Sequence, residues 1–181
     1  IDAMHRLNSA NRRIALLSNA PRRISAVADR LTEMNIMPDQ YDAIMSSGEE
    51  VWCHLSERTD PWYRSLGRRC LHIGAERDRG MFDGLDLLLT EDPADAEFVL
   101  NTGTFDDGDS VEAYDHLLQD LQLRALPMIC ANPDLVVMRA DEMQICAGAL
   151  AERYEALGGS VRWHGKPDPS VYLACLAKLE M

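Results

Sequence analysis

The sequence has few basic residues and few aromatic ones. Of its 181 residues, 18 are Lys or Arg and 30 are Asp or Glu, which gives a formal net charge of -12, and only 6% are aromatic. A surface with this negative charge repels nucleic-acid phosphates and anionic lipid headgroups. We therefore expect neither a nucleic acid nor a membrane as a partner. Hydrophobic residues make up 46% of the chain, enough for a sizeable core, which excludes a disordered protein.

Long apolar runs and several short signatures are also missing. No apolar run reaches the ~18 residues of a membrane-spanning helix, and no charged-then-apolar leader opens the chain. The five cysteines are scattered without a C-x-x-C pair, and the histidines are dispersed, so neither a disulfide framework nor a metal site is expected. The absence of G-x-G-x-x-G and of a P-loop argues against a nucleotide-binding domain. We therefore expect a cytoplasmic protein with inert thiols.

Short strand patterns alternate with helix patterns along the whole chain. Apolar runs at residues 14–17, 70–73 and 98–100 are typical of buried strands. Between two such runs, Ile24, Val27 and Leu31 recur at helical spacing. This alternation predicts an α/β protein with a mostly parallel sheet.

Two strand ends carry polar residues that a simple turn does not need. Ser18 and Asn19 end the run IALLSNAP, and Lys166 follows the strand-like VRW in VRWHGKPDPS. In open α/β sheets, strand ends and helix starts converge on the binding crevice, so these residues are placed to meet an anion. Each junction alone also fits an exposed turn.

Arg22 and Arg23 stand at a helix start, where positive charge is unfavourable because it opposes the helix dipole. Either one of these arginines contacts an anion, or both are exposed to solvent.

The two junctions, in this order, resemble motifs of the haloacid dehalogenase superfamily of phosphohydrolases. In that superfamily a hydrophobic strand ends in Ser or Thr, and a Lys follows a later strand. The turn ANPD at 131–134 and the helix start CAGAL at 146–150 are similar to those of its capped branch, which contains nitrophenyl phosphatases, nucleotide monophosphatases and pyridoxal phosphate phosphatases. The resemblance implies a Rossmann-like core, an incomplete parallel sheet flanked by helices, with an inserted α/β cap. We expect the core at 1–66 and 161–181 and the cap at 67–160.

The resemblance also implies a mechanism. An Asp on the first strand attacks phosphorus, a second Asp protonates the leaving group, and Mg²⁺ neutralises charge. Ser18 and Lys166 would be catalytic and would bind the phosphoryl group together with Asn19. Asn132 and Asp134 would help to select the substrate, a small phosphorylated metabolite, although an ordinary N-P-D turn explains them equally well. A homodimer that forms through the cap is implied as well.

The chain departs from the superfamily pattern at both ends. The D-x-D-G motif should precede the segment IDAMHRL, and an acidic metal-binding turn should follow the last helix; neither is present in the sequence. We therefore expect a fragment of a Mg²⁺-dependent phosphatase that lacks the nucleophile and a complete metal site and is inactive by itself. The alternative is a non-catalytic α/β module that binds a partner protein or a small anion.

Overall fold

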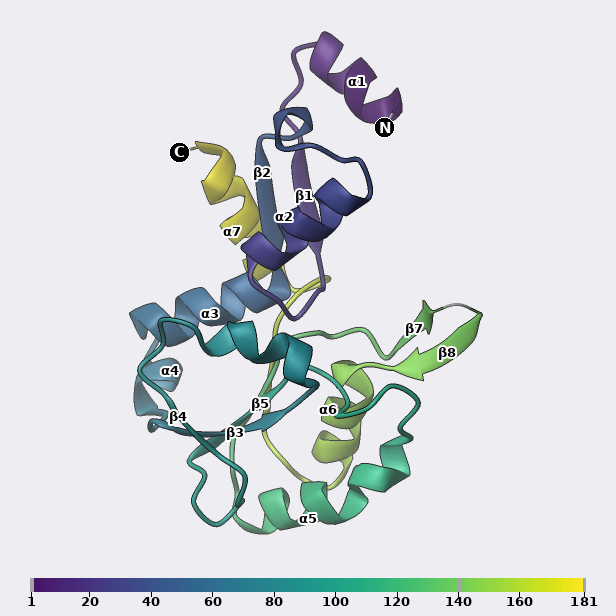
Figure 1. The fold of residues 1–181 in the computed structure, drawn as a ribbon. Coiled ribbons are helices and arrows are strands. Elements are labelled where there is room, and N and C mark those ends of the chain that lie inside the picture. Colours follow the sequence, from purple (N-terminus) through teal and green to yellow (C-terminus); the bar gives the residue numbers. More distant parts are fainter. Residues whose placement is uncertain (1, 140, 181) are drawn as a thin grey trace.

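Two parallel sheets organise the protein, a small one near both chain ends and a larger one below it in Figure 1. The structure is a computed structural model and describes residues 2–139 and 141–180. Parallel strands need crossover connections, which the helical segments between the apolar runs supply. The predicted α/β class is therefore confirmed. No helix within the described ranges is long and apolar enough to cross a membrane.

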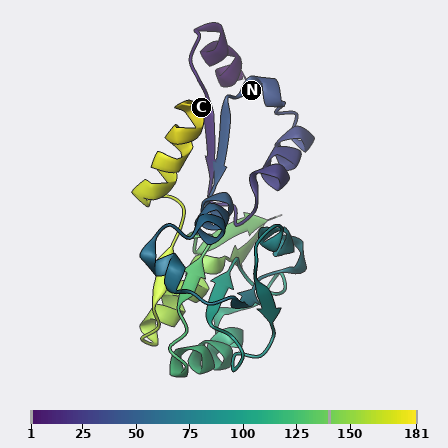
Figure 2. The same ribbon diagram turned by 90° about the vertical axis from the view of Figure 1, so that its left-hand side faces the viewer.

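The small sheet consists of two parallel strands with a helix on either side (Figure 2). Its register places Ser18 opposite Ser46, so both strands end at the same level. Met45 of the second strand packs against Val171 and Cys175 of the C-terminal helix in a small buried core. The elements of this part are α1 (Asp2–Ser9), β1 (Ala15–Ser18), α2 (Ile24–Glu33), η1 (Pro38–Gln40), β2 (Ala43–Ser46) and α7 (Pro169–Glu180).

The large sheet has five parallel strands in the order β4-β3-β5-β6-β9 and is covered on both faces. Leu71 and Val99 point to the face covered by α5 and α6, whereas Cys70 and Phe98 point to the face covered by α3 and α4. Burial on both faces explains why these strands are continuous apolar runs in the sequence. The elements of this part are α3 (Ser47–Glu57), α4 (Pro61–Ser65), β3 (Arg69–Ile73), η2 (Glu76–Phe82), β4 (Leu88–Thr90), β5 (Phe98–Asn101), η3 (Val111–Tyr114), α5 (Asp115–Leu123), β6 (Met128–Cys130), α6 (Ala147–Ala156) and β9 (Val161–Trp163).

Two features of this arrangement were not expected from the sequence. Strand β9, which we assigned to the core, pairs with β6 of the large sheet. An antiparallel hairpin of β7 (Val136–Arg139) and β8 (Glu142–Ile145) follows β6; β7 is exposed along its length, so it shows no buried-strand pattern. The core at 1–66 and 161–181 and the cap at 67–160 stay predictions.

The five cysteines are all free thiols. Cys70, Cys130 and Cys175 are buried, and Cys53 and Cys146 are partly buried. Burial raises the pKa of the Cys130 thiol to about 12 and raises the pKa of the other four thiols as well. Since the thiolate is the reactive form, these cysteines are poor nucleophiles at neutral pH, in agreement with the prediction of inert thiols.

Candidate functional site

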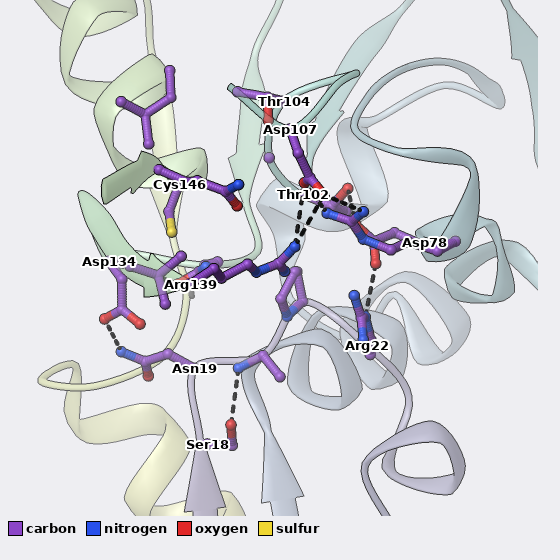
Figure 3. Close-up of a pocket in the computed structure, with 18 residues that line it drawn as sticks. Ser18, Asn19, Arg22, Asp78, Thr102, Thr104, Asp107, Asp134, Arg139 and Cys146 are labelled. Atoms are coloured by element: carbon purple, nitrogen blue, oxygen red, sulfur yellow. Dashed lines mark hydrogen bonds and ion pairs between the residues drawn. The ribbon is translucent and has the colours of Figure 1, made fainter. Parts of the chain in front are cut away.

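A cavity of about 270 Å³ lies where the ends of both sheets face each other (Figure 3). From the small sheet, Ser18 and Asn19 line it at the end of β1, and from the large sheet Asn132 and Asp134 line it after β6. The β7–β8 hairpin borders the cavity with Arg139 and its neighbours. All the parallel strands that reach the cavity do so with their carboxyl ends, the edge where open α/β sheets bind ligands.

The side chain of Asn19 joins three chain segments at one edge of the cavity. Its Nδ2 donates to Asp134 Oδ1 at 2.8 Å and to the Lys166 carbonyl oxygen at 3.3 Å. Its Oδ1 accepts the backbone N–H of Lys166 at 2.7 Å. Because Asn19 is only 9% exposed, water competes little for these bonds. Three of the residues singled out in the sequence, Asn19, Asp134 and Lys166, therefore lie in direct contact.

Lys166 reaches the end of β1 from the loop after β9. Its Nζ donates to the Leu17 carbonyl oxygen at 3.1 Å. The next residue, Ser18, accepts the backbone N–H of Ala20 with its Oγ at 3.1 Å. The structure thus brings Lys166 to the strand end that carries Ser18. Ser18 lines the 270 Å³ cavity, whereas Lys166 is not one of its lining residues. Asn132 holds the N-P-D turn, since its Oδ1 accepts the backbone N–H of Asp134 at 3.0 Å.

The glycine of the G-K-P segment is required by its surroundings. Gly165 has a φ of +100°, a conformation that side chains disfavour. A Cβ at this position would lie 2.8 Å from Asn19 Oδ1 and 2.8 Å from Pro133 Cδ. The backbone of the Lys166 loop therefore packs directly against the Asn19 side chain and the N-P-D turn. This close contact fixes the position of Lys166.

Three arginines line the cavity, and each is paired with an aspartate (Figure 3). Arg22 Nε lies 2.8 Å from Asp78 Oδ1. Arg77 and Arg139 share Asp107, at 2.8 and 3.2 Å. Sequence reasoning considered only Arg22 among them, because Arg77 and Arg139 lie in segments without a motif and meet only through the fold. The cavity lining also contains Asp134, so the three arginines of this arginine wall are balanced by three aspartates and the charged side chains of the lining carry no net formal charge.

Arg23 serves the structure and does not line the cavity. Its Nε contacts Glu49 Oε2 at 2.7 Å, and its guanidinium lies 3.6 Å from the centroid of the Trp52 ring. Burial raises the pKa of Glu49, but hydrogen bonds from Arg23 and from the backbone N–H of Ile24 outweigh it and lower the pKa overall. Of the two arginines at the helix start, only Arg22 therefore lines the cavity.

A polar chain continues from Asp78 into the large sheet. Thr102 Oγ1 lies 3.5 Å from Asp78 Oδ2 and 2.9 Å from His72 Nε2. Burial lowers the pKa of His72 to about 4, although the nearby Asp78 carboxylate acts in the opposite direction. The imidazole is therefore neutral at pH 7, and it supports the Thr102 side chain behind the cavity wall.

Acidification is expected to destabilise the protein through His72. Between the ordinary value of 6.5 and the folded value of about 4, the unfolded chain binds a proton that the folded chain does not, so the free energy of unfolding falls as the pH falls. His72→Gln should therefore lose less stability between pH 7 and pH 5 than the parent in urea unfolding. His116→Gln, an exposed control on α5, should behave like the parent. An equal loss in His72→Gln and the parent would refute this role of His72.

No protein-family model matches the sequence, and a comparison with curated proteins gives no match. Among solved structures, the chain is similar to a haloacid dehalogenase-like hydrolase from Brucella suis 1330, with a TM-score of 0.90 and 37% identity over 99% of this chain and 63% of that chain.

Two further structures share the fold at lower identity. One is a p-nitrophenyl phosphatase from Archaeoglobus fulgidus, with a TM-score of 0.71 and 18% identity over 99% of this chain and 66% of that one. The other is a glycerol phosphate phosphatase from Mycobacterium tuberculosis in complex with calcium, with a TM-score of 0.70 and 17% identity over 98% and 51% of the two chains. The chain thus spans less than two thirds of the length of each of these proteins.

Proposed function

Because this chain belongs to the haloacid dehalogenase superfamily of hydrolases, we propose that the whole protein is a Mg²⁺-dependent phosphatase that hydrolyses a small phosphate monoester through an aspartyl-phosphate intermediate. The observation that carries the proposal is the meeting of Ser18, Asn19 and Lys166 at the carboxyl end of β1. Phosphoryl transfer depends mainly on positioning and on compensation of charge on the phosphoryl oxygens. A hydroxyl, an amide and an ammonium group at one strand end can supply both.

Ser18 and Lys166 have hydrogen-bond donors to spare for a phosphoryl group, whereas both amide donors of Asn19 are used within the protein. Ser18 Oγ accepts a bond from Ala20, which leaves its own hydroxyl proton free to donate to a phosphoryl oxygen. Lys166 Nζ uses one of its donors on the Leu17 carbonyl, so two remain for a phosphoryl oxygen and a carboxylate nucleophile. Asn19 positions Lys166, because its side chain donates to the Lys166 carbonyl oxygen and accepts the Lys166 backbone N–H.

The residues around the cavity do not by themselves form a magnesium site. Asp78 and Asp107 are paired with arginines, and Asp134 accepts a hydrogen bond from Asn19, whereas Mg²⁺ is bound by carboxylates and waters that face the ion. The superfamily implies a divalent ion, and a protein of the same fold is in complex with calcium. For the whole protein we propose that this ion is Mg²⁺.

The large sheet is proposed to select the substrate. Asn132 and Asp134 line the cavity together with Ser18, and the arginine wall stands beside them with each arginine paired to an aspartate. A small phosphorylated metabolite with further polar groups would match this lining. The homodimer through the cap and the cytoplasmic location stay predictions.

Release of phosphate from p-nitrophenyl phosphate with Mg²⁺ tests the function. We compare the 181-residue chain with a protein extended at both ends, and we expect activity only in the extended protein, because the 181 residues contain no D-x-D-G motif. Activity that depends on Mg²⁺ in the extended protein supports the phosphatase. Silence of both proteins would favour the non-catalytic module that binds a partner protein or a small anion.

A further inference from the structure

Glu50, His54 and His164 form a second polar cluster, at the junction of the two sheets. Glu50 and His54 lie one turn apart on α3, which runs between the two parts of the protein (Figure 1), and His164 comes from the loop after β9. One ligand atom from each residue lies within 4.8 Å of the other two. The side chains of Glu50 and His164 are 2% and 3% exposed. The phosphatase chemistry proposed above uses none of the three.

Two atoms of this cluster lack a hydrogen bond within the described part of the chain. Glu50 Oε2 and His164 Nδ1 are both buried without a hydrogen bond, and they lie 3.3 Å apart, a distance at which they form an ion pair if His164 is protonated. Buried polar atoms are nearly always bonded, because an unpaired one costs free energy. Neighbouring ligands of a tetrahedral zinc ion are also separated by roughly 3.3 Å when the metal–ligand bonds are about 2.0–2.1 Å long. A cation bound by both atoms would explain the pair.

The remaining polar atoms of the two buried residues are held by neighbouring side chains. Glu50 Oε1 accepts the hydroxyl of Ser170, and His164 Nε2 is hydrogen-bonded to the hydroxyl of Tyr63. Such outer partners orient metal-binding carboxylates and histidines and fix the histidine tautomer. The Tyr63 hydroxyl can donate to Nε2 or accept from it. In the tautomer whose proton lies on Nε2, His164 Nδ1 presents a lone pair to Glu50 Oε2, and a cation between these two atoms would bind both.

We propose that Glu50, His54 and His164 bind a divalent transition-metal ion, with Zn²⁺ the best match. Two imidazoles and one carboxylate are a known zinc donor set with a fourth position left for water, whereas Mg²⁺ and Ca²⁺ prefer oxygen ligands. His54 is the partly exposed member, so the ion enters and leaves on its side. The bound ion would tie α3 to the loop that continues to Lys166 and would stiffen that loop.

Titration calorimetry of the metal-free full chain with ZnCl₂ tests the proposal. We expect one equivalent of Zn²⁺ to bind with a Kd below about 10 µM, and Co²⁺ in its place to give the visible absorption of a four-coordinate site. Glu50→Gln and His54→Gln should each weaken Zn²⁺ binding at least about 100-fold, because loss of a ligand exceeds the 10–100-fold effect of an outer partner. Tyr63→Phe, which keeps all three ligands, should weaken it by about 10–100-fold.

A matched control and a folding check accompany these variants. His116→Gln removes an exposed histidine of α5 and should bind Zn²⁺ like the parent. Circular dichroism reports whether each variant is folded. If Glu50→Gln is unfolded, the Zn²⁺ affinity of His54→Gln, whose residue is partly exposed, tests the proposal instead. Absence of tight Zn²⁺ binding, or unchanged affinity in His54→Gln, overturns the proposal, as does an NMR spectrum of the Zn²⁺-treated chain with His164 Nδ1 protonated toward Glu50. None of these results bears on the phosphatase activity, which is measured separately.

Discussion

Lys166→Ala in the whole protein is expected to lower kcat/KM for phosphate-ester hydrolysis by about 1000-fold or more. Removal of one preorganised charge or donor at a reacting group costs about 100- to 1000-fold, and Lys166 supplies both a charge and several donors. Within the described structure the ammonium group is bonded to the Leu17 carbonyl, so its loss should lower stability by only about 1 kcal/mol. The variant should therefore remain folded and lose activity.

Lys178→Ala provides the matched control for this prediction. Lys178 lies in the last turn of α7 and is partly exposed, so its loss should leave hydrolysis unchanged. Both variants are assayed with p-nitrophenyl phosphate, and their melting temperatures are compared with that of the parent. Near-normal turnover in Lys166→Ala would remove Lys166 from the proposed phosphoryl site.

Asn19→Asp is expected to destabilise the protein by about 2–4 kcal/mol. The substitution replaces a donor by a carboxylate oxygen next to Asp134 Oδ1, now 2.8 Å away, and next to the Lys166 carbonyl, now 3.3 Å away. Both neighbours are acceptors, and the site is 9% exposed, so water screens the repulsion poorly. A fall in Tm on the order of 10 °C should be seen by thermal unfolding.

A charge exchange shows whether this loss comes from the Asn19–Asp134 contact. The double variant Asn19→Asp with Asp134→Asn restores a donor opposite an acceptor, so it should regain most of the lost Tm; only the bond to the Lys166 carbonyl stays broken. Asn35→Asp, at an exposed turn with a φ of +60°, should leave Tm unchanged. A double variant no more stable than Asn19→Asp alone would show that the contact is not the cause.

The strand ends at the site could be predicted from the sequence because burial leaves a clear pattern. Ser18 and Asn19 follow an apolar run, as β1 requires, and Lys166 follows a second one. Their order along the chain, together with parallel pairing, places them at one edge. What the sequence does not show is that Asn19 bonds both Asp134 and Lys166, because such contacts depend on the side-chain positions in the folded protein.

The residues that sequence reasoning missed belong to exposed segments or to distant parts of the chain. Arg139 lies on β7, an exposed strand without burial alternation, and it meets Arg77 only through Asp107. Likewise, the helical spacing of Glu50 and His54 places them on one face of α3, but His164 joins them from a loop far along the sequence. The dispersed histidines therefore gave no metal-ligand pattern until the fold brought two of them together.

A crystal structure of the whole protein with orthovanadate, an analogue of the phosphoryl group, tests the central claim most directly. We expect the anion at the carboxyl end of β1, in hydrogen-bond contact with Ser18 Oγ and Lys166 Nζ, on the side of the cavity where Asn19 holds the Lys166 loop. An anion bound only by the arginine wall, with Ser18 and Lys166 still making the contacts described here, would contradict the proposed phosphoryl site.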